Sequence, residues 1–221
     1  MGEVPRRAPA RLLVVLDADS TLIQDEVIEL LADAAGSRPL VAEITERAMR
    51  GELDFAASLR ERVATLRGLP ESVFEEVGRR IRPTDGVHDL IAGVQASGGV
   101  VGVVSGGFHE LLDPIGADYG LDVWSANRLA VEHGALTGTV SGPIIDAQAK
   151  ARALREWAER FGVPLGRTVA VGDGANDLLM MAEAGLSVAF NAKPLVRRHA
   201  DVSITVPDLR QVLPLLGLSR G

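Results

Sequence analysis

Short apolar runs rich in valine and leucine alternate along the chain with longer segments of mixed polarity. Three of these runs, at residues 12–16, 100–104 and 168–171, pass directly into small or acidic polar residues. Continuous apolar runs of this length are typical of strands buried on both faces of a parallel sheet. Two further runs predict strands at 187–190 and 202–206.

Between the strands, the apolar residues recur at helical spacing. They predict helices over 86–97, 109–119, 146–161 and 175–184, and another that begins at Asp208. Regular alternation of strands and helices predicts an α/β fold with a doubly wound parallel sheet, that is, a Rossmann-like core. Ligands of such sheets bind at the carboxyl ends of the strands. The polar residues that follow the three apolar runs are expected at these ends.

The segment from residue 24 to residue 82 breaks this alternation. Its apolar positions follow a helical period, and turn-forming residues interrupt it at Gly36, Pro39, Gly51, Gly68 and Pro70. We therefore predict a small helical cap over 24–82, inserted after the first strand of a core that comprises 11–23 and 83–221. Residues 1–10 are predicted to form a flexible tail. Residues 124–140 are typical of β structure, with turns expected at His133-Gly134 and Thr137-Gly138.

Composition excludes several classes of protein. A chain of 221 residues with a net charge of −7 has no general attraction for nucleic acid or for an anionic membrane, so neither is expected as a partner. No apolar run is long enough to span a bilayer. The chain contains no cysteine, which excludes disulfides, thiolate metal sites and a cysteine nucleophile. This composition is typical of a cytoplasmic protein.

The sharpest chemical feature is the pair Asp17 and Asp19, which directly follows the first predicted strand. If both carboxylates face one cavity, one can act as a nucleophile while the other carries a proton. Their mutual repulsion would raise one pKa or recruit a cation. The same residues are equally typical of a solvated acidic turn or a helix N-cap.

A second acidic motif, Gly172-Asp173-Gly174-Ala175-Asn176-Asp177, follows the strand at 168–171. Oxygen ligands without histidine or cysteine suit Mg²⁺. Taken alone, the motif is just as typical of a glycine-rich turn with a capping aspartate.

Two weaker features concern phosphate. Ser105-Gly106-Gly107 ends the middle strand, where a hydroxyl and backbone N–H groups can bind an anion, although such a triplet is usually only a turn. Lys150 is one of only two lysines in the chain and lies in the first turn of the helix at 146–161. A cation is electrostatically unfavourable there, which indicates a task such as neutralising a phosphate, although a surface lysine is the more ordinary interpretation.

The order of these motifs along the chain resembles the haloacid dehalogenase superfamily of phosphatases, over residues 11–215. The resemblance is closer to the phosphoserine phosphatase family, where a glutamate follows the first aspartate by nine residues, as Glu26 follows Asp17. Met49, Phe55 and Arg62 are similar to that family's cap pattern. Arg62 is chosen over Arg60 by its spacing to Phe55.

The resemblance implies hydrolysis of O-phospho-L-serine, the last step of serine biosynthesis, through an aspartyl phosphate. Asp17 would be the nucleophile and Asp19 the general acid and base. Mg²⁺ would be bound by Asp17, the carbonyl of Asp19, Asp173 and Asp177. The substrate would be held by the remaining matched residues, which are Glu26, Met49, Phe55, Arg62, Ser105, Gly106, Lys150 and Asn176. A carboxylate and a guanidinium suit the ammonium and carboxylate of an amino acid.

Three alternatives remain at this point. The phosphoryl group can pass to another alcohol such as homoserine instead of water. The substrate can be a different small phosphate ester. The chain can be a catalytically silent binding protein on this fold, which the joint presence of Asp17, Asp19, Lys150 and Asp173 opposes. The partner is expected to be a small molecule, and the oligomeric state is left open, with a homodimer as one option.

Overall fold

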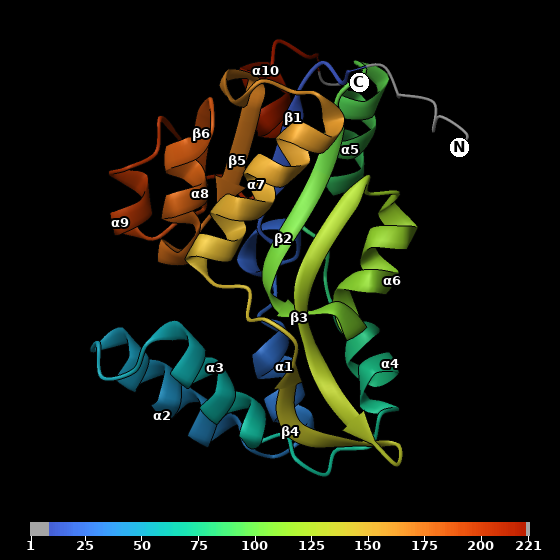
Figure 1. Cartoon of the computed structure of the whole chain (residues 1–221), viewed down its shortest axis with the longest axis vertical. Coiled ribbons are helices and arrows are strands. Elements are labelled where there is room, and N and C mark those ends of the chain that lie inside the picture. Colours follow the sequence, from blue (N-terminus) through green and yellow to red (C-terminus); the bar gives the residue numbers. More distant parts are fainter. Residues whose placement is uncertain (1–8, 220–221) are drawn as a thin grey trace, which may run out of the picture.

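A single seven-stranded sheet organises the molecule. The computed structural model describes residues 9–219, and the sheet has the order β4-β3-β2-β1-β5-β6-β7 (Figure 1). Its strands are β1 (Leu13–Leu16), β2 (Val100–Phe108), β3 (Val123–Glu132), β4 (Ala135–Ser141), β5 (Thr168–Gly172), β6 (Leu186–Phe190) and β7 (Val202–Ile204). All neighbouring pairs are parallel except β3 and β4. The predicted doubly wound α/β fold is confirmed.

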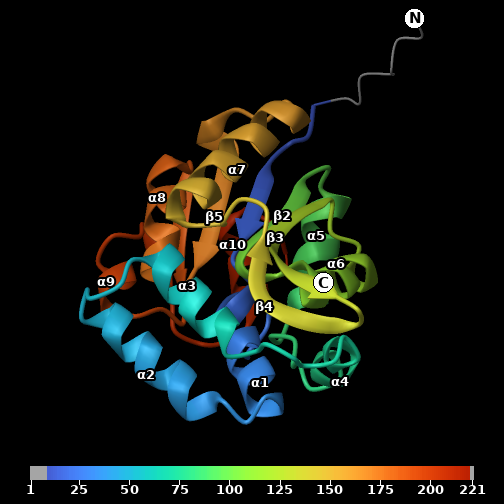
Figure 2. The ribbon, with the colours of Figure 1, turned by 60° about the horizontal axis from the view of Figure 1, so that its bottom comes forward.

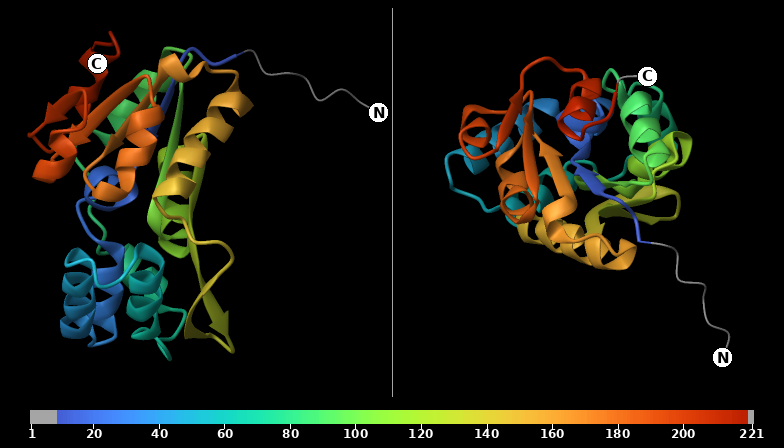
Figure 3. Two further views of the ribbon diagram at one scale, coloured as in Figure 1. Left: turned by 60° about the vertical axis from the view of Figure 1, so that its left-hand side comes forward. Right: turned by 90° about the horizontal axis from the view of Figure 1, so that it is seen from above.

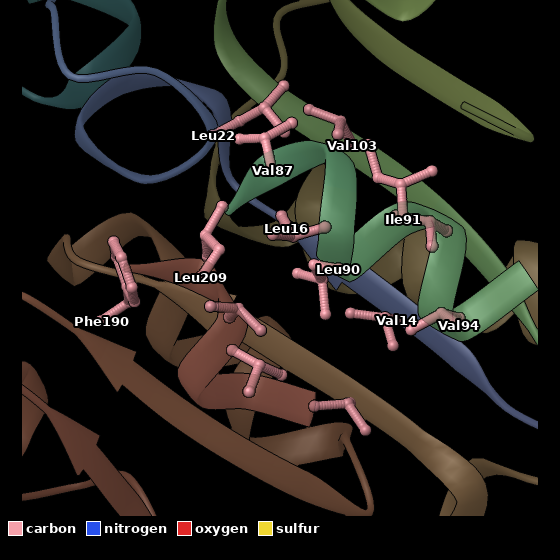
Figure 4. Packing of buried hydrophobic residues seen from close by; sticks show 14 of the residues in the cluster. Val14, Leu16, Leu22, Val87, Leu90, Ile91, Val94, Val103, Phe190 and Leu209 are labelled. Carbon is pink, nitrogen blue, oxygen red and sulfur yellow. The ribbon is translucent and has the colours of Figure 1, made fainter. Parts of the chain in front are cut away.

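The strand β1 lies at the centre and sends alternate side chains to opposite faces, as the period of a strand requires. Val14 and Leu16 join the apolar cluster under helix α5 (Val87–Ala96), together with residues of α6 (His109–Tyr119) and α10 (Val212–Leu215). Figure 4 shows this packing, with Leu90 of α5 close to β1. Leu13 and Val15 pack instead with α7 (Ala147–Phe161), α8 (Leu178–Glu183) and α9 (Pro194–Arg197). Helices therefore cover both faces of the sheet (Figure 3).

The register of the parallel strands brings their polar ends together. Leu16 pairs with Val103 of β2 on one side and with Val171 of β5 on the other. The residues that follow these positions, including Asp17 and Asp173, therefore emerge at one edge of the sheet. Such an edge is the usual ligand site of an open parallel sheet.

The cap is helical, as predicted. It contains α1 (Val27–Ala34), α2 (Arg38–Met49), α3 (Phe55–Ala64) and α4 (Val73–Gly78), which lie together at the carboxyl-terminal edge of the sheet (Figure 2). Its apolar residues form a third cluster, which also takes in Phe108, Leu111, Leu129 and Leu136 of the core. The two connections to the core run side by side, since the N–H of Gln24 donates to the carbonyl of Arg82 at 2.8 Å and the N–H of Thr84 donates to that of Leu22 at 3.0 Å.

The hairpin of β3 and β4 extends from the core and contacts the cap. The N–H of Gly68 donates to the carbonyl of Leu136 at 2.8 Å, and Leu136 returns a bond of 2.8 Å to Leu69. The turn predicted at His133-Gly134 joins the two strands. The turn predicted at Thr137-Gly138 is wrong, because these residues lie within β4 at a shift in its register with β3. The positive φ of Gly138, 78°, belongs to this irregularity and not to a chain reversal.

Other boundaries also differ from expectation. The strand β2 does not end at Val104 but continues to Phe108. The helix predicted over 175–184 is a 3₁₀ turn, Ala175–Asp177, followed by α8. Most of the predicted tail, residues 1–8, lies outside the described residues. At its end, however, the N–H of Ala10 donates to the carbonyl of Phe161 at 2.9 Å, so this residue is held against the end of α7.

Candidate functional site

A cavity of about 110 Å³ lies between the carboxyl ends of the strands and the cap. The core lines it with Asp17, Asp19, Gly106, Gly107, Phe108, Asp173, Gly174, Asn176 and Lys193. The cap lines it with Glu26, Ile28, Phe55, Leu59 and Arg62. The cavity thus unites residues that are up to 176 positions apart. It brings together most of the site residues that the sequence predicted.

Asp17 is almost fully buried at the end of β1. Its Oδ1 accepts a hydrogen bond from the N–H of Ala18 at 2.7 Å and lies 2.7 Å from the Nζ of Lys150. None of the hydrogen bonds described for residues 9–219 uses Oδ2, so this oxygen is available for chemistry. Burial, and then the nearby charge of Asp177, raise the pKa of Asp17 to about 8 against the opposing effect of Lys150.

Lys150 is completely buried, so the interpretation of a surface lysine is wrong. Its Nζ lies 2.7 Å from Asp17 and 2.8 Å from Asp177. Burial by itself would lower the pKa of Lys150, but the two carboxylates outweigh it and the pKa rises above its usual value. Two of the three ammonium protons are engaged, which leaves a third for a ligand oxygen.

Asp19 follows β1 in a tight turn in which Ser20 has a φ of 58°. Its Oδ2 accepts a hydrogen bond from the N–H of Val27 at 3.2 Å, while its Oδ1 is buried and has no hydrogen-bond partner in the described chain. Burial, followed by the charges of Glu26 and Asp17, raises its pKa well above the usual value. Asp19 can therefore carry a proton into the cavity near neutral pH.

Three carboxylates form a candidate metal site. Asp17, Asp173 and Asp177 offer ligand atoms that all lie within 4.8 Å of one another. The pKa of Asp173 is raised to about 6, chiefly by burial and then by Asp177. A hard cation fits this set, because its donors are oxygens and it contains more negative charge than Lys150 can neutralise.

Asp177 is fully buried and binds both Lys150 and the loop at Gly174. Its Oδ1 accepts from Lys150 at 2.8 Å and its Oδ2 accepts from the N–H of Gly174 at 3.0 Å. A Cβ at Gly172 would lie only 2.3 Å from the Oδ2 of Asp177, so the close approach requires glycine there. Asp177 therefore orients Lys150 and the loop, which leaves Asp173 with the freer oxygens for a cation.

The segment Ser105–Gly107 contributes backbone to the cavity. Gly106 and Gly107 line it, whereas Ser105 is buried behind them and its Oγ accepts from the N–H of Gly107 at 2.8 Å. A Cβ on Gly107 would lie 2.8 Å from Val27, and one on Gly106 would lie 3.1 Å from the ring of Phe55. Only residues without a side chain allow the cap to approach this loop so closely.

The cap contributes a second set of groups. Phe55, Leu59 and Arg62 recur at helical spacing on α3 and line the cavity along one face of that helix. Glu26 precedes α1, and its Oε1 accepts a hydrogen bond from the hydroxyl of Ser20 at 2.7 Å. The charges of Glu26 and Asp19 face Arg62, although within residues 9–219 no carboxylate lies within ion-pair distance of its guanidinium. Both charged groups are available for a ligand.

Two predictions about the cap have different outcomes. Arg62 lines the cavity while Arg60 is exposed away from it, which agrees with the choice made from spacing. Met49 is not brought to the cavity. It ends α2 with 80% of its surface exposed, so in this conformation it does not reach a substrate in the cavity.

Lys193 was not predicted as a site residue, yet its side chain lines the cavity. Its N–H donates to the carbonyl of Asp173 at 3.2 Å, and its charge opposes the rise in the pKa of Asp173. The scarcity of lysine in this chain was the available signal. It pointed to Lys193 as much as to Lys150, but no surrounding motif gave Lys193 a role.

Comparison with known proteins agrees with this geometry. Residues 14–182 match the family of haloacid dehalogenase-like hydrolases. The chain belongs to this family. Among these hydrolases, it is 52% identical over 204 residues to a phosphoserine phosphatase of Streptococcus thermophilus, covering 92% of this chain and 95% of that protein. It therefore falls in the phosphoserine phosphatase family, as its motifs suggested.

Longer relatives and solved structures assign the chain to the same family. The chain is 52% identical to a phosphoserine phosphatase of Mycobacterium tuberculosis, covering 95% of this chain and 51% of the relative. It thus spans about half the length of some of the curated relatives it matches. A phosphoserine phosphatase solved as a phospho-aspartyl intermediate analogue superposes with a TM-score of 0.88 at 43% identity, covering 94% of this chain and 99% of that one. A substrate-bound phosphoserine phosphatase has the same TM-score and identity, with 93% and 98% covered.

Proposed function

We propose that this hydrolase converts O-phospho-L-serine and water to L-serine and inorganic phosphate. The observation that carries the proposal is the joint presence of two sets of groups around one cavity. Asp17 and Asp19 line it and offer phosphoryl-transfer chemistry, with the buried Lys150 directly against Asp17. Glu26 and Arg62 on the cap side offer partners for an amino-acid zwitterion. The names of the relatives above support the same substrate.

In the first step, the Oδ2 of Asp17 attacks the phosphorus atom while the bond between phosphorus and the serine oxygen breaks. Asp19 donates its proton to the departing oxygen, which leaves as the serine hydroxyl. An aspartyl phosphate remains on Asp17. The raised pKa of Asp19 supports this role, because an ordinary aspartate would have lost its proton at neutral pH.

In the second step, Asp19 accepts a proton from a water molecule that attacks the same phosphorus atom. The acyl phosphate bond breaks, inorganic phosphate leaves and Asp17 regains its carboxylate. The free proton of Lys150, the backbone at Gly106 and the side chain of Asn176 bind the phosphoryl oxygens in both steps, while Ser105 acts behind them through the N–H of Gly107.

The residues present fit Mg²⁺, held by Asp17, Asp173 and the backbone carbonyl of Asp19, with Asp177 orienting the loop. When bound, the cation neutralises charge on the phosphoryl oxygens. The N–H of Ala18 and the Nζ of Lys150 hold the Oδ1 of Asp17, which leaves its Oδ2 for the attack on phosphorus.

At the other side of the cavity, Glu26 binds the substrate ammonium and Arg62 binds the substrate carboxylate. Phe55 covers the glycine loop and limits the access of water. The cap, taken as residues 24–82, opens and closes over the core comprising 11–23 and 83–221. The two adjacent connections at Gln24 and Arg82 are suited to act as its hinge.

The wider setting follows from the same proposal. Within residues 9–219 no helix combines the length and the apolar content needed to cross a membrane. A cytoplasmic enzyme of serine biosynthesis with a small-molecule substrate is consistent with the absence of cysteine. The homodimer stays a prediction that light scattering of the purified chain decides.

The proposal is tested by phosphate release from phosphoserine, phosphothreonine, sugar phosphates and phosphoglycolate, with Mg²⁺ and with EDTA. Phosphoserine should be the preferred substrate, and chelation should stop turnover. Release without any added alcohol separates a hydrolase from a phosphotransferase that uses homoserine. Preference for a sugar phosphate would refute the assignment of phosphoserine.

Binding of Mg²⁺ is expected to be coupled to proton release. The raised pKa values of Asp17, about 8, and Asp173, about 6, mean that the metal-free cluster keeps a proton below these values. Since the cation competes with that proton, its affinity should rise as the pH rises from about 6 to about 8 and then level off. Calorimetry in two buffers of different ionisation enthalpy measures the proton count. An affinity that is constant over this range would contradict the prediction.

Arg62→Ala should reduce kcat/KM for phosphoserine by about tenfold to a hundredfold, because a charge-assisted hydrogen bond contributes about 1.5–3 kcal/mol. Hydrolysis of a simple aryl phosphate should change little, since that substrate has no carboxylate for Arg62 to bind.

Arg60→Ala is the matched control, because Arg60 is an exposed arginine on the same helix. It should leave both substrates unaffected. If Arg62→Ala instead reduces both substrates equally, Arg62 stabilises the cap and the reason to name phosphoserine is lost.

A further inference from the structure

The strand β2 contains an irregularity at the point where it meets the cavity. Val104 pairs with Ser125 of β3, and Phe108 pairs with Asn127. Three residues of β2 therefore lie opposite a single residue of β3, and the segment Ser105–Gly107 departs from the regular ladder. This departure delivers the backbone of Gly106 and Gly107 to the cavity. It also interrupts the regular ladder that would otherwise fix their orientation.

The side chain of Asn127 makes hydrogen bonds to the backbone where the regular pairing of β2 with β3 is interrupted. Its Nδ2 donates to the carbonyl of Gly106 at 2.8 Å, and its Oδ1 accepts from the N–H of Ile145 at 2.8 Å. Asn127 is 1% exposed, so neither bond competes with water. Both hydrogen-bonding ends of one buried amide are thus used, and they contact two segments that are 39 residues apart.

The bond to Gly106 completes the restraint of one peptide group. Asn127 binds the carbonyl of the peptide between Gly106 and Gly107, and the Oγ of Ser105 accepts from its N–H at 2.8 Å. Because a peptide group is planar, holding both ends fixes its orientation. This restraint is needed here because two successive glycines have wide conformational freedom.

The bond to Ile145 restrains the other phosphate-binding element. Ile145 precedes Asp146, whose carboxylate accepts from the N–H of Ala149 and caps the start of α7. Lys150 lies in the first turn of that helix. Asn127 therefore acts on the position of Lys150 through only a few residues of rigid backbone.

We propose that Asn127 is a positioning residue that sets the spacing between the Gly106 loop and the Lys150 helix around the phosphoryl group. Asn127 is not among the residues that line the cavity, so it acts through the backbone that it holds. This proposal rests on the proposed function only in requiring that a phosphoryl group binds between the Gly106 loop and Lys150. Asn127 acts at the phosphoryl end, so its effect is independent of what the phosphoryl group is attached to.

The test uses Asn127→Ala, with Ser187→Ala as a matched control. Ser187 is also buried, lies on the strand β6 and makes hydrogen bonds of 2.7 and 2.9 Å with Asp201 through its hydroxyl. Both variants should lower the Tm. Asn127→Ala alone should reduce kcat/KM by about tenfold to a hundredfold, equally for phosphoserine and for a simple aryl phosphate, and should weaken inhibition by inorganic phosphate by a similar factor.

Asn127→Asp separates the two hydrogen bonds. It keeps an acceptor for Ile145 and the volume of the side chain, but it places an oxygen against the carbonyl of Gly106. It should therefore be no more active than Asn127→Ala. If the alanine variant does not fold, the same kinetic and inhibition measurements are made on Asn127→Asp. Kinetics and phosphate inhibition like those of the wild type in either variant, with only the Tm lowered, would overturn the proposal.

The outcome is separable from that of the proposed function. If the wild-type chain hydrolyses the aryl phosphate but not phosphoserine, the substrate assignment fails while the role of Asn127 is still judged on the aryl phosphate. If neither ester is hydrolysed, calorimetry with inorganic phosphate decides. Binding that is weaker in Asn127→Ala than in Ser187→Ala supports the proposal, and equal binding refutes it.

Discussion

Asp17→Asn is expected to reduce turnover of phosphoserine by about four orders of magnitude or more, which is the scale on which loss of a catalytic nucleophile acts. An amide has the shape of the carboxylate but does not form a stable phosphoryl adduct. The measurement is single-turnover phosphate release, combined with mass spectrometry to detect the phosphorylated protein. The wild type should be phosphorylated on Asp17 and the variant should not.

The fold should survive this substitution. The side-chain oxygen of an asparagine can still accept from the N–H of Ala18 and from Lys150, which now hold the Oδ1 of Asp17. Because the change also removes a negative charge from a buried acidic cluster, the Tm of the metal-free protein should not fall by more than a few degrees. Asp118→Asn, on the exposed side of α6, is the control and should retain full activity. Near-normal activity of Asp17→Asn in a preparation free of deamidation would refute the nucleophile.

The placement of the candidate catalytic groups could be predicted because parallel strands share one carboxyl edge. Apolar runs that end in Asp17, Ser105 and Asp173 must meet there once the sheet is parallel. Helical spacing was also sufficient for the inner face of α3, since Phe55 and Arg62 lie two turns apart and Arg60 falls on another face.

Other features depend on contacts that no local pattern encodes. The exposure of Met49 follows from how the end of α2 is placed relative to the core, and helical periodicity does not determine that placement. The role of Asn127 depends on the irregular pairing of β2 with β3, which is set by the register of a neighbouring strand. The burial of Lys150 between two carboxylates joins residues that are distant in sequence.

Lys150→Met is expected to destabilise the metal-free protein more than any other single change considered above. Methionine has a similar length and is apolar, so little packing is lost. What remains is a buried pair, Asp17 and Asp177, without its cation. Removing one partner of a buried ion pair typically costs about 3–5 kcal/mol. For a domain of this size that corresponds to a fall in Tm of roughly 6–20 °C.

Three comparisons isolate the electrostatic cause of this loss. Lys193→Met, at the exposed rim of the same cavity, should lower the Tm by much less. Addition of Mg²⁺ should recover part of the stability of Lys150→Met, because a bound cation replaces some of the missing positive charge. The double variant Lys150→Met with Asp177→Asn should be more stable than Lys150→Met alone, since it removes one of the uncompensated charges while an asparagine oxygen can still accept from Gly174. If the double variant is instead less stable, Lys150 contributes through its packing. The proposed neutralisation of Asp17 and Asp177 by Lys150 is then wrong.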